Sequence, residues 1–183
     1  MRNLVVCCDG TWNTPDQTDQ GVPTPTNVVR LFNALAEHGS GGEAQLGYYH
    51  PGVGTDGSWW DRVVGGGAGV GLGRNVMSAY QWLAQHYRPG DRLFLFGFSR
   101  GAYTARSLTG FIAKYGLLKP GSPLSVNQLY ERYRRAEDRT IWKLIEAREN
   151  GTLSDCTLEE QWMLKYSQAI TIKLIGVWDT VGA

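Results

Sequence analysis

The sequence has almost no net charge. Eighteen lysines and arginines stand against 17 aspartates and glutamates among its 183 residues, which leaves a formal net charge of +1. A protein that attracts nucleic acid or an anionic membrane through its overall field needs a marked excess of positive charge. The composition therefore argues against a nucleic-acid partner.

Long hydrophobic runs and cysteines are also scarce. No apolar stretch approaches the roughly 20 residues needed to cross a bilayer, and the one at the N-terminus is shorter than the core of a signal peptide. The three cysteines are odd in number, and the side chains of Cys7 and Cys8 would point to opposite faces of a strand. We therefore expect a cytoplasmic protein with reduced thiols and no transmembrane segment.

The glycine run at 65–73 lacks the signature of a nucleotide site, and metal-ligand spacings are also missing. The glycine-rich run at 65–73 contains neither a G-x-G-x-x-G frame nor a following G-K-[ST], which are the marks of nucleotide-binding turns. Cysteine and histidine do not occur at metal-ligand spacings. The sequence thus predicts no cofactor and no metal.

Glycine and apolar residues are plentiful instead. The 24 glycines predict many tight turns, and a hydrophobic content of 42% predicts one folded domain over residues 1–183. Apolar runs predict strands at 4–8, 45–50, 92–98 and 169–178. Helical patterns follow Thr26 or Asn27, Asn75 and Ser99, and loops are expected at 16–26 and 52–74.

This alternation of strands and helices predicts an α/β fold with a mostly parallel sheet, whose functional groups lie at the carboxyl ends of the strands. Residues 117–168 are charged and amphipathic, and we interpret them as a helical insertion. Such helices either cap the carboxyl edge or only cover a face of the sheet. As a cap they would supply four aromatic residues to an acyl site: Tyr130, Tyr133, Trp142 and Trp162.

The segment Gly97-Phe98-Ser99-Arg100-Gly101 directly follows the third predicted strand. It has the G-x-S-x-G pattern of a nucleophile elbow, in which glycines let a serine hydroxyl stand clear of the sheet on a strained turn. An apolar strand before it and an amphipathic helix after it favour that interpretation over a plain glycine-rich turn. Ser99 is therefore the candidate nucleophile.

An oxyanion hole needs backbone amides on both sides of the nucleophile. The amide of Arg100 begins the helix after Ser99, and Gly10 or Thr11 follows the first strand at the same end of the sheet. The alternative for Asp9-Gly10 is ordinary turn chemistry, with the Asp9 side chain bonded to its own backbone.

Asp179 follows the fourth strand and is the candidate acid, although a loop aspartate bonded to its own backbone is the alternative. No histidine follows it. The three histidines, His38, His50 and His86, all precede Ser99, against the Ser, acid, His order of α/β hydrolases. His50 ends the second strand, two strands from Ser99 in a hydrolase-like order. We therefore expect the base beyond Ala183, in a longer hydrolase.

Three aromatic residues are candidates for binding an ester or lipid substrate. Trp59 and Trp60 lie in the glycine-rich loop, where two core tryptophans are the equal alternative, and Tyr103 lies on the first turn after Ser99.

Several segments together resemble a known family. VCCDGTWNTP, PTNV, YYxPGVGT, GFSRGAYTAR and GVWDTVGA are similar to the uncharacterised α/β-hydrolase domains that include the catalytic domain of class-one type VI secretion lipase effectors. The resemblance covers nearly the whole chain. It implies esterase or phospholipase chemistry with Ser99 as nucleophile and Asp179 as acid, and a histidine that would follow the aspartate. A hydrolase-like module that only binds lipid or a protein partner is the other hypothesis.

Overall fold

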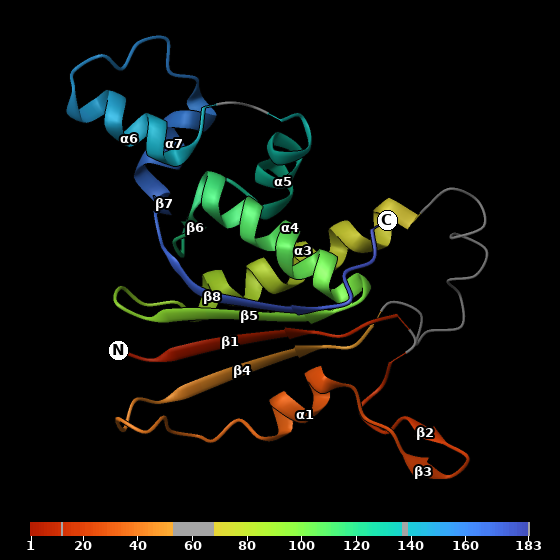
Figure 1. Cartoon of the computed structure of the whole chain (residues 1–183). Coiled ribbons are helices and arrows are strands. Elements are labelled where there is room, and N and C mark those ends of the chain that lie inside the picture. The colour runs from red at the N-terminus through yellow and green to blue at the C-terminus, as the bar shows by residue number, and fades with distance from the viewer. Residues whose placement is uncertain (12, 53–67, 137–138, 183) are drawn as a thin grey trace.

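The computed structural model describes residues 1–11, 13–52, 68–136 and 139–182. At its centre lies a sheet of four strands in the order β4-β1-β5-β8, and all neighbouring strands are parallel (Figure 1). The strands are β1 (Asn3–Cys8), β4 (Gln45–His50), β5 (Arg92–Phe98) and β8 (Ile172–Trp178). Six helices accompany the sheet in the described part of the chain, so the predicted α/β class is confirmed.

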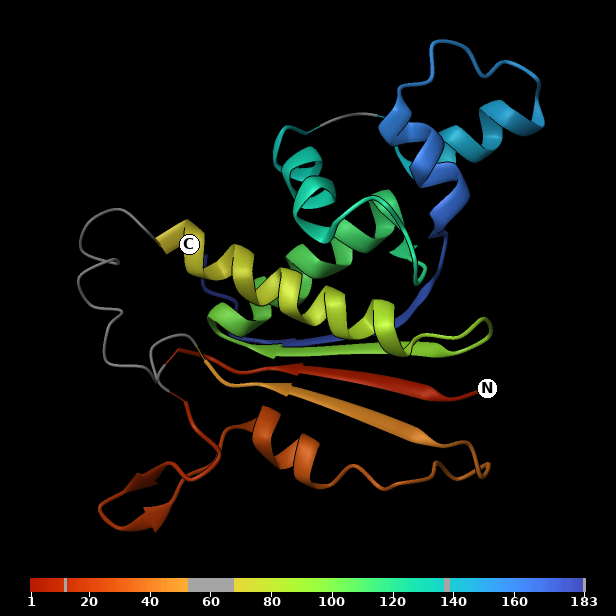
Figure 2. The same cartoon turned by 180° about the vertical axis from the view of Figure 1, so that it is seen from behind.

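Helices cover both faces of this sheet. The helices α3 (Ala68–His86) and α4 (Arg100–Tyr115) pack on one face, and the shorter α1 (Asn27–Asn33) packs on the other (Figures 1 and 2). Every residue of β1 is buried, as its unbroken apolar run predicted. A hydrophobic core lies on each face of the sheet, and alternate residues of β1 pack into the two cores. Leu4 and Val6 lie on the α3 and α4 side, and Val5 and Cys7 lie on the α1 side.

The cover on the α1 side is incomplete. On β5, the residues facing α3 and α4 are fully buried, whereas Phe94, Phe96 and Phe98 on the opposite face are only half-buried. On the neighbouring edge strand β8, Leu174 is 46% exposed. The α1 face of β5 is therefore the more accessible one, whereas β8 is exposed on both faces, since Ile175 on the α3 and α4 side is 41% exposed.

The helix α3 begins earlier than the sequence predicted. We expected a loop up to residue 74 and a helix capped by Asn75, but α3 starts at Ala68 and Asn75 lies inside it. Glycine disfavours helix by about 1 kcal/mol relative to alanine, and packing overrides that preference here. A Cβ on Gly73 would lie 3.1 Å from the Tyr130 ring, so this glycine lets a neighbouring helix come close. Such a contact leaves no mark in the local sequence.

Part of the loop predicted at 16–26 is a hairpin. Its strands are β2 (Thr18–Asp19) and β3 (Val22–Pro23), joined by Gln20 and Gly21, which both have positive φ angles of 48° and 82°. Two-residue turns of this kind usually carry Asn-Gly or Asp-Gly. Because Gln20 stands where asparagine or aspartate is usual, the sequence pattern did not predict this turn. The helix that follows is capped by Thr26, one of the two predicted N-caps.

The segment predicted as a helical insertion contains three helices. They are α5 (Val126–Arg134), α6 (Ile141–Glu149) and α7 (Leu158–Tyr166), and the segment is closed at its base by the antiparallel pair β6 (Leu117–Leu118) and β7 (Ser167–Gln168). α5 packs on α3 and α4, and α6 packs on α4 and α7. Figure 1 shows α6 and α7 toward the amino ends of the strands, away from the carboxyl ends of β5 and β8.

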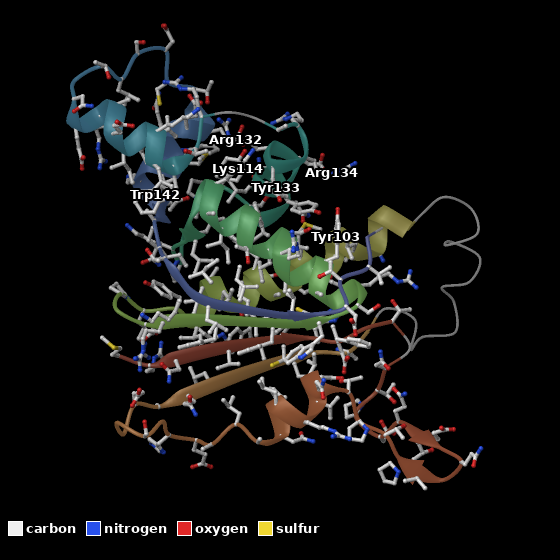
Figure 3. All side chains as sticks on the ribbon, in the orientation of Figure 1. Tyr103, Lys114, Arg132, Tyr133, Arg134 and Trp142 are labelled. Carbon is white, nitrogen blue, oxygen red and sulfur yellow. The ribbon has the colours of Figure 1, made fainter. Side chains whose placement is uncertain are left out.

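Of the two alternatives, the positions of α6 and α7 argue against a cap over the carboxyl edge. They form a third layer on the outside of α3 and α4, because α5 and α6 bury their apolar faces against helices rather than against the end of the sheet. Trp142 on α6 is 49% exposed and lies far from Tyr103 at the beginning of α4 (Figure 3).

A buried ion pair joins α5 to α7, and it yields a stability prediction. Arg132 and Glu160 are both nearly inaccessible, and Arg139 also contacts Glu160. Burial alone would raise the pKa of the Glu160 carboxyl, but the Thr157 amide and the two guanidinium groups outweigh it and hold the pKa below its ordinary value. Glu160→Gln should lower the free energy of unfolding by about 3 kcal/mol at pH 7.

Because the pKa is lowered in the folded state, this stabilisation is present above the ordinary carboxyl pKa and is lost as the pH falls through the lowered value. Urea unfolding of the wild type and the variant at pH 7 and under acid should therefore show a shrinking difference. Glu146→Gln, at an exposed position on α6, is the control. Equal stabilities of the Glu160→Gln variant and the wild type at pH 7 would refute the assignment.

Candidate functional site

Ser99 occupies a strained turn between β5 and α4. Its φ of 53° and ψ of −121° lie in a region that non-glycine residues rarely adopt. It stands at the N-cap position, yet its side chain makes no capping hydrogen bond. Thr26, Ser125, Thr140 and Thr157 stand at the same position of other helices, and all accept a backbone hydrogen bond there. The predicted strained turn is confirmed, and it leaves the Ser99 hydroxyl unused as a cap.

The two glycines of the G-x-S-x-G pattern make this turn possible. A Cβ on Gly97 would lie 2.4 Å from the carbonyl oxygen of Gly101. A Cβ on Gly101 would lie 2.2 Å from the carbonyl oxygen of Cys8, at the end of β1. No side chain fits at such distances, so the spacing of the motif reflects the close approach of α4 to the ends of two strands.

The strain at Ser99 predicts a gain in stability when it is relieved. Ser99→Gly and Ser99→Ala both remove the hydroxyl, but only glycine adopts a positive φ without steric cost. We expect the glycine variant to be more stable than the alanine variant by about 1 kcal/mol. Chemical denaturation of the two variants measures this difference. An alanine variant as stable as the glycine variant would show that the turn is unstrained.

Asp179 lies beside Ser99 at the same edge of the sheet. Phe98 of β5 pairs with Trp178 of β8. Ser99 and Asp179 are the next residues after this pair, so they leave the two strands at the same level. The Ser99 amide donates to the Trp178 carbonyl at 3.0 Å, and the Val181 amide donates to the Ser99 carbonyl at 3.3 Å. Asp179 is exposed and also has a positive φ, 43°. The expected shared edge is confirmed, whereas room for an imidazole between the two side chains stays a prediction.

Hydrogen bonds to the Asp9 side chain hold the loop that follows β1 in place. The side chain is buried, and its Oδ2 accepts hydrogen bonds from the hydroxyls of Thr26 at 2.7 Å and Tyr49 at 2.8 Å. Its Oδ1 accepts the Gly10 amide at 2.8 Å. Burial, and then the bond to Asp9, raise the pKa of the Tyr49 hydroxyl well above its usual range, so it stays a donor. Of the predicted oxyanion donors after β1, the Gly10 amide is thus already engaged by Asp9, and Thr11 is the better candidate.

The three histidines lie in different places. Two of them stand near the amino edge of the sheet: His86, whose carbonyl accepts from Arg2, and His38, which bridges to Ala44 just before β4. His50 ends β4 at the carboxyl edge, and its Nδ1 lies 2.7 Å from the Pro51 carbonyl oxygen. The strand order puts β4 two strands from β5, as expected for His50.

The candidate substrate-binding residues are only partly accounted for. Trp59 and Trp60 lie outside the described residues. Tyr103, on the first turn of α4, lies below Tyr133 of α5 (Figure 3). Burial, and then the neighbouring phenol of Tyr103, raise the pKa of Tyr133. Tyr103 therefore lies next to the helical layer, and its contact with substrate stays a prediction.

Other chemistries have little support in the described ranges. Burial raises the pKa of the Cys7 and Cys8 thiols to about 12, so neither is a ready nucleophile. Within residues 1–11, 13–52, 68–136 and 139–182, no three His, Cys, Asp or Glu side chains gather as metal ligands would. The helices of those ranges include none that is long and apolar enough to cross a bilayer.

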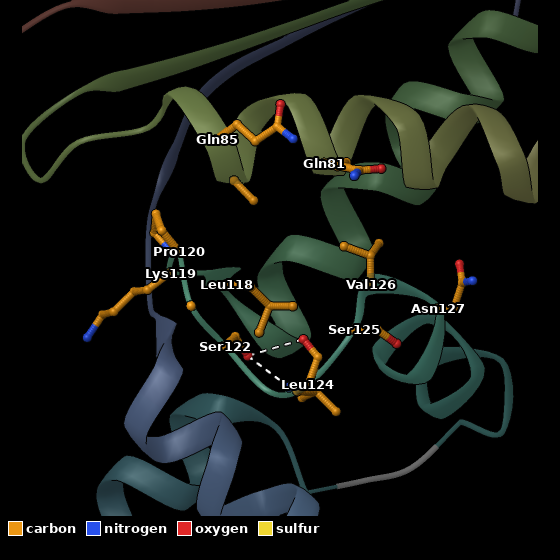
Figure 4. Close-up of a pocket in the computed structure, with 12 residues that line it drawn as sticks. Gln81, Gln85, Leu118, Lys119, Pro120, Ser122, Leu124, Ser125, Val126 and Asn127 are labelled. Atoms are coloured by element: carbon orange, nitrogen blue, oxygen red, sulfur yellow. Dashed lines mark hydrogen bonds between the residues drawn. The ribbon is translucent and has the colours of Figure 1, made fainter.

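Two cavities differ in their relation to Ser99. One of about 380 Å³ lies at the carboxyl edge and includes Phe98, Trp178 and Asp179 in its wall. Another of about 410 Å³ lies between the second half of α3 and the loop before α5 (Figure 4). The wall of the second cavity contains Gln81, Gln85 and Lys119 but no residue of the carboxyl edge. The first cavity is therefore the one that adjoins the candidate site.

Known proteins resemble this chain over nearly its whole length. The family model of the catalytic domain of type VI secretion, Tle1-like phospholipase effectors matches residues 2–183. An uncharacterized protein of Saccharomyces cerevisiae is 30% identical over 197 residues, and the chain spans only 27% of that relative's length. No solved structure matches the chain. Since the family model covers nearly the whole sequence, the chain belongs to the family of Tle1-like phospholipase effector catalytic domains.

Proposed function

We propose that this chain carries the nucleophile and the acid of a serine hydrolase that cleaves carboxylic esters of phospholipids. The observation that carries the proposal is Ser99, a strained serine at a strand-to-helix turn whose side chain does not cap its helix. Strain of this kind costs about 1–3 kcal/mol and persists where function requires it. The family's phospholipase description supports the substrate class, and we propose an α/β-hydrolase fold for the same reasons.

In the proposed reaction the Ser99 oxygen attacks the ester carbonyl carbon, and its proton passes to an imidazole base oriented by Asp179. The amides of Thr11 and Arg100 stabilise the negative charge on the carbonyl oxygen, helped by the dipole of α4. The ester C–O bond then breaks, and the leaving alcohol takes the proton from the imidazole. Water hydrolyses the acyl-serine by the same route, which releases the fatty acid and restores the Ser99 hydroxyl.

We propose that the base lies outside these 183 residues. His38 and His86 stand at the opposite edge of the sheet, and His50 lies two strands from Ser99, or roughly 10 Å at 4.8 Å per strand. The lack of an imidazole beside Asp179 also favours a second candidate function. In that alternative, the chain is a hydrolase-like module that binds lipid or a protein without turning it over.

Hydrolysis of p-nitrophenyl butyrate by two proteins tests the proposal. One is the 183-residue chain, and the other is a longer chain that continues past Ala183 and carries the proposed base. The first should retain only the residual acceleration that binding and the oxyanion hole provide, and the second should hydrolyse the ester at ordinary rates. If the short chain is fully active and His50→Ala abolishes that activity, His50 is the base. If neither protein hydrolyses the ester and both bind phospholipid vesicles, the alternative function is correct, and the chain is a module that binds lipid without turnover.

A further inference from the structure

The cavity beside Ser99 is formed by four segments that meet at the carboxyl edge. The loop after β1, the beginning of α1 and the ends of β5 and β8 enclose about 380 Å³. Phe98 and Asp179 are in its wall, and these residues flank Ser99 in the chain and in the register. Ligand pockets of small molecules begin at about 300 Å³. The cavity is thus large enough for the polar part of a substrate whose ester reaches Ser99.

One wall of the cavity holds a polar atom without a partner. The backbone of Gln17 is fixed by bonds from its amide to the Thr14 carbonyl and from the Thr24 amide to its own carbonyl. The Gln17 Oε1 is buried and accepts no hydrogen bond from the described part of the chain. This oxygen has almost no exposed area, so it lies behind the surface of the cavity, and a ligand would meet it only after the Gln17 side chain moves.

The charged groups of the wall have opposite signs. Among the described residues of the wall, Arg30 is the only cationic one, and it forms no ion pair with another described residue. Asp179 is the only anionic residue in the described part of the wall, and the amides of Asn13 and Asn27 add to the polar lining. A guanidinium binds phosphate through charge-assisted hydrogen bonds, and a carboxylate binds an amine. A ligand with both charges matches this wall better than an anion or a cation alone.

Aromatic rings lie on the same side as the carboxylate. Phe98 and Trp178 are in the wall, and Trp178 is stacked on Phe96 with the ring centroids 6.3 Å apart. The face of an aromatic ring attracts ammonium groups, and quaternary ammonium most of all in cages of several rings. Trp178 precedes Asp179 directly, so an amine bound here would meet both a ring and a carboxylate.

We propose that this cavity holds the zwitterionic head group of a phospholipid, a phosphate ester that carries a cationic amine, with Arg30 as the residue that recognises the phosphate. The inference rests on the proposed function, because it places the head group of the substrate next to the ester that Ser99 attacks. Asp179 then has two roles, as the acid that orients the imidazole and as the partner of the amine, and each role uses one of its two carboxylate oxygens.

Calorimetric titration of the Ser99→Ala chain tests the inference without turnover. Phosphorylcholine and phosphorylethanolamine should bind at least about tenfold more tightly than glycerol 3-phosphate or choline. Arg30→Gln should weaken their binding roughly tenfold to hundredfold, whereas Arg148→Gln, at an exposed position of α6, should leave it unchanged. Asn27→Asp, which suits the first turn of a helix, should also weaken it by adding a negative charge to the cavity. Equal binding of glycerol 3-phosphate, or no effect of Arg30→Gln, would overturn the inference.

A second titration identifies the source of the head group. Dihexanoyl phosphatidylcholine below its micellar concentration should bind more tightly than phosphorylcholine if the cavity serves a lipid. Binding of phosphorylcholine alone would assign the cavity to a free metabolite and refute the proposal. The ester p-nitrophenyl butyrate has no head group, so its hydrolysis without head-group binding would refute only this inference. Head-group binding without hydrolysis of any ester would refute the proposed function.

Discussion

Replacing Ser99 with alanine is expected to lower the turnover of a short-chain ester by about 10⁶-fold in a protein that carries both this chain and the base that we propose outside it. The hydroxyl is the only group in the proposed mechanism that forms a bond to the substrate, so nothing in the site can substitute for it. The folded structure should persist, because the Ser99 side chain makes no capping hydrogen bond whose loss would weaken α4.

Ser78→Ala is the matched control for this variant. Ser78 is exposed on α3, and its loss should leave turnover unchanged. Rates for the two variants and the wild type are compared on p-nitrophenyl butyrate at saturating concentration, with thermal unfolding as a check on folding. A Ser99→Ala protein that keeps a tenth or more of the wild-type turnover would exclude Ser99 as the nucleophile.

Asp179→Asn is expected to reduce turnover by about 10⁴-fold. An amide in this place no longer stabilises the imidazolium that forms when the base takes the serine proton. Asparagine tolerates a positive φ, so the backbone at this position should be kept. The expected loss is therefore in turnover, with little change in the Michaelis constant of a substrate that lacks a head group.

Asp155 provides a control of the same residue type and backbone conformation. It is exposed, and its φ of 48° is close to the 43° of Asp179. Asp155→Asn should be fully active, which separates the chemical effect of the carboxylate from any effect of the turn. Equal activities of the two variants would remove Asp179 from the triad.

Sequence patterns predicted the elements whose signals are local. β4 and β5 have the predicted boundaries, because turn residues bracket short apolar runs. The Ser99 turn was predicted because both glycines and both flanking elements lie within a few residues of it. Two features were not predicted: the beginning of α3 at Ala68 and the position of the helical layer. Both depend on packing between segments that are distant in the sequence, such as Gly73 against Tyr130.

The same distinction holds within the site. The role of Asp9 was left open, since its partners Thr26 and Tyr49 lie 17 and 40 residues away in the sequence. The only local signal was an aspartate directly after a fully buried strand. Likewise, the cavity wall joins Arg30 to Asp179 across most of the chain, and no spacing rule relates them.

The central claim, that Ser99 is the nucleophile, is tested most directly by a fluorophosphonate, which forms a covalent adduct with an activated serine. Peptide mass spectrometry of the labelled natural protein should find one equivalent of label, on the peptide that contains Ser99. The label should be absent from the Ser99→Ala variant and present in Ser78→Ala. Ester hydrolysis by a preparation that carries no adduct on Ser99 after treatment would contradict the account.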